Sequence, residues 1–474
     1  MSRATLQFLT KDEILRIHET SLRLLEEVGL SVHSEQVTKL LLSAGAHSSK
    51  DGKRVLLPRD MVKSSLSSAP KSVLLASRTD EGDITIPGNR LYSANGGEGV
   101  YIKDMLTGAT TRPTIQSVEK FVSLVEALPS IDIVWDMVGA IEQPNEIKGL
   151  LELKANLEFS RKHYQGGAMN AGEARRMVEL VSTLVGGPEE LAKRPIFSAV
   201  QCPISPLTFD KDLAEAQVEL SKAGIPVASM SAAVAGLTSP ATISGTIAEV
   251  NAENLASLTI CQVAKKRAPF IYSSDSCPGD LRSGSIDYEA LEAVLMRTAS
   301  GQMGRYYGLP VQVAAVSLEE TALLLSRVRE GVPYMLPHAL VPSDITSGFG
   351  GTDQAAGASY ELLVADSWVW AAARELVREF SADAETISFE TIRAGALDNN
   401  FLSKRHTAAH FREEFSITRN PEAVLSSRGQ PRARGDLLYK AKEEVVRILK
   451  DAKPVTTKRE SEGMQKVIDK VRKG

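Results

Sequence analysis

The stretch from residue 225 to residue 316 decides the fold. It contains IPVASMSAAVAG (225–236), APFIYSSDSCPGD (268–280) and LPVQVAAV (309–316), three short apolar runs that each begin at a proline-containing turn. Long helical segments separate the three runs. Strands that are apolar on both faces and alternate with helices are typical of parallel sheets. The stretch therefore predicts repeated strand–helix units, and the carboxyl ends of such strands carry the site in parallel β/α folds.

The composition limits the class of protein. Of the 474 residues, 43% are hydrophobic and 24% are charged, and 55 basic against 59 acidic side chains give a net charge of −4. This balance argues against a general nucleic-acid binder. The three cysteines, Cys202, Cys261 and Cys277, do not form a disulfide framework. No apolar run approaches about 18 residues, and Met1 to Thr10 lack the apolar region of a signal peptide, so we expect a cytoplasmic protein without membrane association.

Strand candidates continue on both sides of the opening stretch. They are residues 131–141, 163–169, 196–202, 227–231, 270–274, 311–316 and 332–336, with another strand near Tyr92 or Tyr101. Helices are expected between them, at 146–160, 171–184, 211–223, 241–265, 288–307 and 318–329. About eight alternating units favour an α/β fold, the closed (β/α)8 TIM barrel, over an open sheet.

The flanking segments lack this alternation. Residues 1–90 contain amphipathic helices between short strands, which predicts an N-terminal α+β cap. The TIM-barrel catalytic domain is expected to span residues 91–380. Residues 381–474 are predicted to form a C-terminal helical extension, with 451–474 frayed or forming a surface helix.

Several familiar motifs are absent or incomplete. Gly96-Gly97-Glu98-Gly99 is not a dinucleotide fingerprint, because a strand follows it where a helix is required. His406 and His410 are spaced i, i+4 but lack the glutamate of a zincin helix, so helix packing is favoured and no metal site is expected. Cys202 has no legible His–Asp partner and is interpreted as a small buried thiol.

Polar side chains gather instead at the predicted strand ends. Each one alone is more typical of a satisfied barrel rim, but together they would line one face, as a small-molecule site requires. They are Asn95, Glu98, the run from His163 to Gly167, Gln201, Cys202, Ser229, Ser231, Ser273, Ser274, Asp275 and His338. Aromatic residues near the same rim are candidates for a cage around a cation, although core packing is the commoner role of each. These are Tyr92, Tyr164, Tyr272 and Phe349.

Five segments carry a family resemblance. They are RPTIQSVEKFVSLVEALPSID (112–132), AGLTSPATISGTIAEVNAENLASLTICQ (235–262), MRTASGQMGRYYGLP (296–310), ASYELLVADS (358–367) and NNFLSKRHTAAHFREEF (399–415). From about residue 10 to 420, the chain resembles the trimethylamine:corrinoid methyltransferase family, and more narrowly its members without pyrrolysine, which include glycine betaine methyltransferases. The resemblance implies a TIM barrel that moves a methyl group from an amine to the cobalt of a corrinoid (cobalamin), which is carried on a partner protein or supplied free.

The chain departs from the family pattern after Pro310. Many members continue there with a polar segment, and the trimethylamine enzymes place pyrrolysine in roughly this region, whereas this chain has the apolar VQVAAVSLEETALLLSRVREGVP and only standard residues. A tertiary amine is a poor methyl donor, but a quaternary ammonium leaves as a neutral amine and needs no proton donor. We therefore expect a quaternary amine as substrate, with glycine betaine as the first candidate. The enzyme would desolvate the cation and align one N–CH3 bond with Co(I).

This chemistry suggests roles for the candidate residues. The four aromatic residues would form the cage, Glu98 or Asp275 would supply nearby negative charge, and His338, at the end of the seventh strand, would hold a substrate carboxylate. Further substrate contacts are expected from the polar strand ends, and a glycine-rich loop would admit the corrinoid. The polar residues are Asn95, Gln201, Ser231 and Ser274, and the loop glycines are Gly348, Gly350 and Gly351.

Alternatives remain open at this point. The substrate can be another betaine or methylamine, such as proline betaine, carnitine or a trimethylamine-like compound. A barrel lyase or aldolase would need a lysine at a strand end, and a non-catalytic barrel would bind betaines without transferring a methyl group. We also expect the barrel to self-associate.

Overall fold

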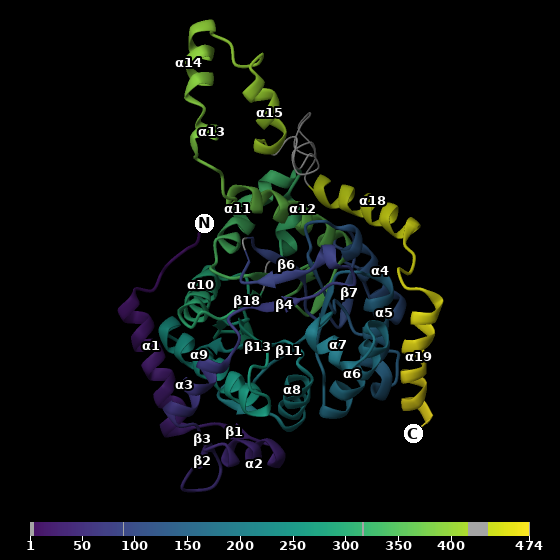
Figure 1. The fold of residues 1–474 in the computed structure, drawn as a ribbon. Coiled ribbons are helices and arrows are strands. Elements are labelled where there is room, and N and C mark those ends of the chain that lie inside the picture. The colour runs from purple at the N-terminus through teal and green to yellow at the C-terminus, as the bar shows by residue number, and fades with distance from the viewer. Residues whose placement is uncertain (1–3, 89, 315–316, 416–434, 474) are drawn as a thin grey trace.

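Eight parallel strands close into a barrel at the centre of the molecule (Figure 1). The computed structural model describes residues 4–88, 90–314, 317–415 and 435–473. The barrel strands are β6 (Tyr92–Asn95), β9 (Ile133–Trp135), β10 (His163–Gly166), β11 (Phe197–Gln201), β13 (Val227–Ser231), β15 (Phe270–Ser274), β18 (Val311–Ala314) and β19 (Ile345–Phe349). Strands that follow one another in the chain are neighbours in space, and β19 pairs with β6 to close the ring. The predicted (β/α)8 TIM barrel is confirmed.

A helix follows each barrel strand and runs along the outside of the barrel. These helices are α4 (Ile115–Ala127), α5 (Asn145–Phe159), α6 (Ala171–Val185), α8 (Lys211–Ala223), α9 (Ile243–Ala264), α10 (Leu291–Tyr306), α11 (Val328–Ala339) and α12 (Tyr360–Leu376), and α7 (Pro188–Lys193) is a short addition after α6. Most of their bounds lie within a few residues of the sequence prediction, because hydrophobic periodicity and the Gly and Pro residues that interrupt it define them well.

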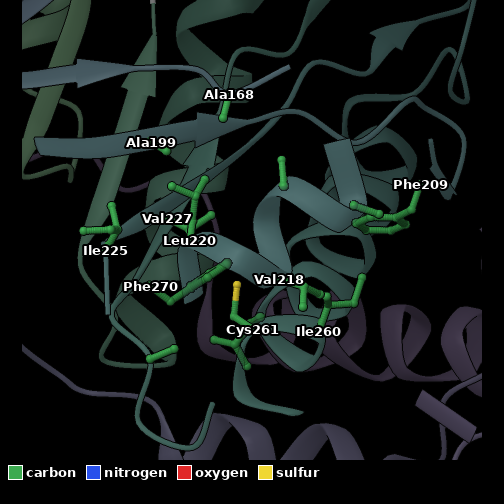
Figure 2. Packing of buried hydrophobic residues seen from close by; sticks show 14 of the residues in the cluster. Ala168, Ala199, Phe209, Val218, Leu220, Ile225, Val227, Ile260, Cys261 and Phe270 are labelled. Carbon is green, nitrogen blue, oxygen red and sulfur yellow. The ribbon is translucent and has the colours of Figure 1, made fainter. Parts of the chain in front are cut away.

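The layer between strands and helices is apolar (Figure 2). Val227 of β13 and Phe270 of β15 belong to one buried cluster with Val218 of α8 and Cys261 of α9. Because side chains alternate along a strand, Ile271, the neighbour of Phe270, faces the barrel interior, where it joins a second buried cluster. This alternation decides which residues of each strand can reach a site inside the barrel mouth.

The prediction of a strand at residues 332–336 is wrong. This apolar run lies inside α11, where Val328, Val332, Met335 and Ala339 are buried at helical spacing. The last barrel strand is β19, whose sequence ITSGF has too few apolar residues to resemble a buried strand. The helix predicted over 318–329 is a short 3-10 helix, Glu319–Leu324. The predicted strand 311–316 is β18 as far as Ala314, and residues 315–316 lie outside the described residues.

The N-terminal segment packs on the outer helices and ends in a hairpin that closes one end of the barrel. It contains α1 (Lys11–Arg23), a π-helical turn (Leu24–Val28), β1 (Ser31–Val32), α2 (Glu35–Ser43), β2 (His47–Ser48), β3 (Val55–Leu56) and α3 (Arg59–Ser68), and then the hairpin of β4 (Val73–Leu75) and β5 (Ile84–Ile86). Side chains of this hairpin pack inside the barrel with Ile133, Ile271 and Ile345. The carbonyl of Ala76 accepts a hydrogen bond from the ring of His163, at the start of β10. The hairpin therefore fills the N-terminal end of the barrel and leaves the C-terminal end for ligands.

Short strands extend the loops beyond the C-terminal end of the barrel. β7 (Tyr101–Lys103), β8 (Thr110–Thr111), β20 (Gly351–Thr352) and β21 (Gly357–Ala358) form one small sheet, and β14 (Val234–Ala235), β16 (Cys277–Asp280) and β17 (Ser285–Ile286) form another. A two-residue strand, β12 (Thr208–Phe209), pairs with β1. These loops raise the wall around the open end of the barrel.

The C-terminal helices divide into two groups. α13 (Ala384–Ile387), α14 (Phe389–Asp398) and α15 (Arg405–Glu414) project away from the barrel (Figure 1). α18 (Asp436–Asp451) packs on α12 and α4, and α19 (Lys458–Lys473) packs on α5 and α6. The last segment forms a helix with one buried side, since Met464, Val467 and Ile468 are buried. Among the described helices, none has both the length and the apolar character that crossing a membrane requires.

Candidate active site

A cavity of about 410 Å³ opens at the C-terminal end of the barrel. Its walls come from residues that end or follow β6, β9, β15, β18 and β19, and from the helices α10 and α11. The aromatic, charged and polar side chains of the wall include Trp135, Asp275, Tyr288, Glu289, Arg297, Glu319, Tyr334, His338 and Ser347. The volume is within the range of small-molecule sites, and the position is where parallel barrels hold their active sites.

A buried guanidinium lies in the wall of this cavity. Arg297, on α10, is only 2% exposed. Its Nη1 donates to His338 Nδ1 at 3.3 Å and its Nη2 donates to the carbonyl of Tyr288 at 3.2 Å, while its Nε has no hydrogen-bond partner among the residues that the structure describes. No described carboxylate forms an ion pair with it, although the charge of Asp275 acts on it from a greater distance. The cavity therefore contains a cation that the protein leaves incompletely satisfied.

Asp275 places a carboxyl group in the same cavity. Tyr288 donates its hydroxyl to Asp275 Oδ2 at 3.0 Å, while Oδ1 is buried and has no partner within the described residues. Burial raises the pKa of Asp275 to about 6, against the opposing effects of the Arg297 charge and the Tyr288 hydrogen bond. The Asp275 charge and burial in turn raise the pKa of Tyr288, which keeps its phenol protonated. Tyr288 thus binds both charged residues, one through its hydroxyl and the other through its carbonyl, and holds them apart.

His338 is neutral in this environment. Burial and the charge of Arg297 lower the pKa of its ring well below the usual value. A guanidinium can only donate, so Nδ1 must accept, and the neutral ring carries its proton on Nε2. His338 lines the cavity from α11, not from the end of a strand as the sequence predicted.

Aromatic rings and further carboxylates complete the lining. Trp135, Tyr288 and Tyr334 are the aromatic residues of the described cavity wall. Glu289 and Glu319 lie in the same wall. Burial raises the pKa of Glu289. Burial and the charge of Glu289 together raise the pKa of Glu319 to about 7. Aromatic faces and carboxylates together favour a bound organic cation.

The loops around the cavity are tied to one buried carboxyl group. Asp366, on α12, accepts hydrogen bonds from Gly350 N at 2.8 Å, Leu318 N at 3.0 Å and Ser317 Oγ at 2.9 Å. Its pKa is raised to about 7 by burial, against these donors. Asp366 thereby fixes the segments that follow β18 and β19 relative to each other. It is a positioning residue, because it does not line the cavity.

Four of the residues predicted as site residues line the cavity: Asp275, His338, Gly348 and Gly351. Gly348 lies in β19 with φ of 113°, a conformation that favours glycine, and its backbone passes close to Gly96. A Cβ on Gly96 would meet Gly348 N at 3.0 Å and the Trp135 ring at 3.1 Å. Two glycines thus allow β6 and β19 to approach each other beneath Trp135.

The aromatic residues predicted for the cage lie elsewhere. Tyr164 and Tyr272 project outward, where their hydroxyls bind Asp136 at 2.6 Å and Asn251 at 3.2 Å. Phe349 packs on Trp370 in the outer layer, with ring centroids 5.1 Å apart. Tyr92 does face the barrel interior, but it packs near the hairpin that closes the opposite end. The alternation of side chains along each strand is the physical reason, since a large ring at a strand end is as often directed toward the helices as toward the site.

The predicted polar contacts and the remaining glycine also lie outside the described cavity wall. Asn95 bridges β6 and β9 through both backbone groups of Trp135, Gln201 binds the carbonyl of Ala168, Ser231 binds Glu253, and Ser274 binds Ser276. Gly350 donates to Asp366. The charge of Glu98 acts on a separate group of acids that includes Asp136 and Glu152. These residues support the barrel and its loops.

The residues that the sequence reasoning missed are Arg297, Trp135, Tyr288, Tyr334, Glu289 and Glu319. The sequence does contain a signal for Arg297. This residue lies at helical spacing from Ala293, Ser300 and Gly304, which are all buried in α10. A lone arginine within such a stripe of small residues indicates a buried charge, which is rare without a function. No comparable signal marked Trp135, since both faces of β9 are apolar.

Comparisons with known proteins agree with this architecture. The family model described as trimethylamine methyltransferase (MTTB) matches residues 2–471. The chain is 27% identical over 419 residues to a glycine betaine methyltransferase of Desulfitobacterium hafniense (strain Y51), covering 86% of this chain and 85% of that protein. It is 26% identical over 409 residues to the trimethylamine methyltransferase MttB of Methanosarcina barkeri, covering 85% and 82%.

A solved structure shares the fold. The crystal structure of the Methanosarcina barkeri monomethylamine methyltransferase (MtmB) matches with a TM-score of 0.51 at 10% identity, over 97% of this chain and 92% of that chain. The resemblance noted from the sequence is confirmed by the family match over nearly the whole chain. The chain belongs to the trimethylamine methyltransferase (MTTB) family.

Proposed function

We propose that the protein transfers a methyl group from a quaternary amine, with glycine betaine as the first candidate, to Co(I) of a corrinoid that is carried on a partner protein or supplied free. Membership of a methyltransferase family supports the reaction, and a relative named glycine betaine methyltransferase supports the substrate. The observation that carries the proposal is the lining of the cavity, where three aromatic residues and three carboxyl groups surround a space open to the barrel mouth.

This lining suits a methylated ammonium group. A trimethylammonium group presents only C–H groups and cannot donate a conventional hydrogen bond, so an enzyme must recognise it through aromatic faces and negative charge. Trp135 and Tyr334 supply aromatic faces, and a desolvated cation gains about 2 kcal/mol from such a contact. Asp275 and Glu319 supply the negative charge when they are ionised.

The reaction demands little chemistry from the side chains. A quaternary ammonium leaves as a neutral tertiary amine, so no proton has to be delivered to it. The residues of the cavity would exclude water and hold one N–CH3 bond toward the mouth, which is catalysis by orientation and desolvation. The protonated phenol of Tyr288 and the neutral ring of His338 are consistent with a site that transfers no proton.

Small residues line one side of the cavity, which favours access by a flat acceptor. Gly97, Gly351 and Ala355 form part of the wall, and their small size leaves that side unobstructed. The segments after six of the barrel strands, which lie at the C-terminal end of the barrel, each carry an exposed apolar side chain: Val100, Ile141, Met169, Ile204, Leu281 and Leu324. Exposed apolar groups around a polar pocket are typical of surfaces that bind a partner protein. They support docking of a corrinoid-carrying partner at this end.

The same lining argues against a Schiff-base lyase or aldolase. Such an enzyme needs a lysine in the site, and no lysine is found among the described residues that line the cavity. A non-catalytic betaine-binding protein would share the cavity but would not methylate cobalt. Only a transfer assay separates that possibility from the proposed enzyme.

The test is a transfer assay with free acceptor. The purified protein would be incubated with cob(I)alamin and a panel of glycine betaine, proline betaine, carnitine and trimethylamine, and the methylcobalamin spectrum followed over time. We expect methylation with at least one betaine and little with trimethylamine. If no member of the panel gives methylcobalamin while the cobalt stays reduced, the proposed function is rejected.

A further inference from the structure

We infer that Arg297 is the anchor for a substrate carboxylate, so that the cavity selects zwitterions carrying both a methylated ammonium and a carboxylate. This inference rests on the proposed function for the identity of the ammonium end. It goes beyond that function by naming the residue that holds the other end and by separating betaines from simple methylamines. The sequence had suggested His338 for this role.

The burial of Arg297 is the first argument. A charge removed from water costs several kcal/mol unless an opposite charge or strong hydrogen bonds compensate it. Arg297 is 2% exposed, and none of the described residues forms an ion pair with it. Burial accordingly lowers the pKa of Arg297 from its usual value. A guanidinium in the wall of a cavity under these conditions calls for an anion inside the cavity.

The hydrogen bonds of Arg297 are the second argument. Its two hydrogen bonds, at 3.2 and 3.3 Å, are long for charge-assisted bonds, and Nε makes none with the described part of the chain. The geometry of a guanidinium matches a carboxylate through two parallel N–H groups. Ser347, in the same cavity wall, also has a buried hydroxyl without a partner. Unused donors on two different elements, α10 and β19, point to a missing acceptor between them.

His338 assists this arrangement as a neutral group. Its Nδ1 accepts from Arg297, which turns the protonated Nε2 away from the guanidinium. Because its pKa is lowered well below the usual value, it adds no second positive charge. The positive charge that faces the carboxylate is therefore that of Arg297 alone within this cluster, and His338 orients it.

The separation of opposite charges explains why a zwitterion fits. Tyr288 donates its hydroxyl to Asp275 and accepts from Arg297 through its carbonyl, so the two charges face the same cavity without pairing with each other. A ligand with a cation at one end and a carboxylate at the other would satisfy both. Trimethylamine, choline and tetramethylammonium have no carboxylate to pair with Arg297.

Calorimetry on the full-length protein tests the anchor without any cobalt. Glycine betaine, choline and tetramethylammonium would be titrated into the native chain, into Arg297→Met and into Arg297→Lys. We expect the native chain to prefer glycine betaine, and Arg297→Met to weaken glycine betaine by about 10- to 100-fold while changing tetramethylammonium less than about threefold. Arg297→Lys should lose less affinity for glycine betaine than Arg297→Met, because lysine keeps the positive charge but lacks the two parallel N–H groups of the guanidinium.

The matched control is Arg305→Lys, the same exchange eight residues further along α10 and outside the cavity wall. It should leave the preference for glycine betaine unchanged. Binding of tetramethylammonium shows that the cavity is intact, so a variant that binds neither ligand is misfolded. In that case the test rests on the native chain alone, through its relative affinities for glycine betaine, choline and tetramethylammonium. A native chain that binds tetramethylammonium or choline as tightly as glycine betaine overturns the anchor, as does an Arg297→Met variant with native betaine affinity.

The two proposals fail in different ways. If betaine binding depends on Arg297 but no methylcobalamin forms, the methyl-transfer function is rejected and the anchor stands. If methyl transfer from tetramethylammonium is as fast as from glycine betaine, and Arg297→Met leaves both rates unchanged, the function stands and the anchor is rejected.

Discussion

Helix α10 carries two arginines in opposite situations. Arg305, near its end, donates from both terminal nitrogens to Asp344, at 2.9 and 2.7 Å, and Asp344 also accepts from Val311 N at 2.8 Å. Arg297, two turns earlier, is more deeply buried and has no carboxylate partner among the described residues. One arginine of this helix thus forms a structural ion pair at the N-terminal end of the barrel. The other is available to bind a ligand at the C-terminal end.

The contrast extends to the two ends of the barrel. At the closed end, Arg374 pairs with Asp132 at 3.0 Å, and Lys162 donates to backbone carbonyls at the end of α4 and beyond. At the open end, Asp275 and Glu319 have pKa values raised to about 6 and 7, mainly by burial. Burial also lowers the pKa of Lys162, to about 8, but the closed-end charges have hydrogen-bonded partners, whereas perturbed charges that line a cleft indicate a functional site.

The contrast between Arg305 and Arg297 is tested most sharply by the free energy of unfolding of two variants. Arg305→Met leaves the buried Asp344 without its partner, and we expect the free energy of unfolding to fall by about 3 kcal/mol. Arg297→Met removes a buried charge that has no ion pair among the described residues, so the free energy of unfolding should stay the same or rise. Urea denaturation followed by circular dichroism would measure both. Equal losses in the two variants would show that Arg297 is a structural residue.

A second prediction concerns the scaffold of the cavity. Asp366→Asn preserves the shape of the side chain but replaces one acceptor oxygen with an NH2 group. This donor would then face a backbone N–H or a hydroxyl group that is itself a donor. We expect a loss of about 1–3 kcal/mol in the free energy of unfolding and a lower kcat, because the segments after β18 and β19 lose their common anchor. Ser367→Ala, at the neighbouring position on α12, is the control. An unchanged melting temperature and kcat in Asp366→Asn would contradict the positioning role.

A third prediction separates the aromatic residues of the cavity from those of the outer layer. Trp135→Leu should weaken the binding of glycine betaine and tetramethylammonium alike, by about 3- to 30-fold, because it removes an aromatic face from the ammonium end. Tyr164→Leu, which removes a ring that packs outside the barrel, should leave both affinities unchanged. Calorimetry measures both. The reverse pattern would favour the cage that the sequence alone suggested.

The smallest expected effect is on pH dependence. The ammonium group does not titrate, and it binds best when Asp275 and Glu319 are ionised, which requires a pH above their pKa values of about 6 and 7. Affinity for tetramethylammonium should therefore rise by about three- to tenfold from pH 5 to pH 8 and level off above that. In Asp275→Asn the rise near pH 6 should disappear. Affinity that is flat or falls over this range in the native chain would exclude both carboxylates from the ammonium end.

The sequence predicted the barrel well because short apolar strands alternate regularly with long helices. The runs around Val227 and Phe270 are apolar throughout, and the helices between them start and end at clear Pro and Gly signals. The error at residues 332–336 has a definite cause. The true last strand, Ile345–Phe349, contains Thr346, Ser347 and Gly348, since part of it forms the cavity wall and not a core.

The site was harder to predict than the fold. Position at a strand end was legible for Tyr164, Tyr272 and Ser274, but the direction of each side chain was not, because both faces of these strands are buried. Asp275 and His338 were found because polar residues stand out after apolar runs. Arg297 and Tyr334 lie on helices that reach the mouth from outside, so a search limited to strand ends could not find them.

The central claim is that the cavity holds a betaine with its carboxylate on Arg297 and its methylated ammonium against Trp135 and Tyr334. A crystal structure of the protein with glycine betaine tests this most directly. The account predicts carboxylate oxygens within hydrogen-bond distance of the Arg297 guanidinium and the ammonium group toward the aromatic residues and the barrel mouth. A betaine bound with its ammonium group toward Arg297, or bound outside this cavity, would contradict it.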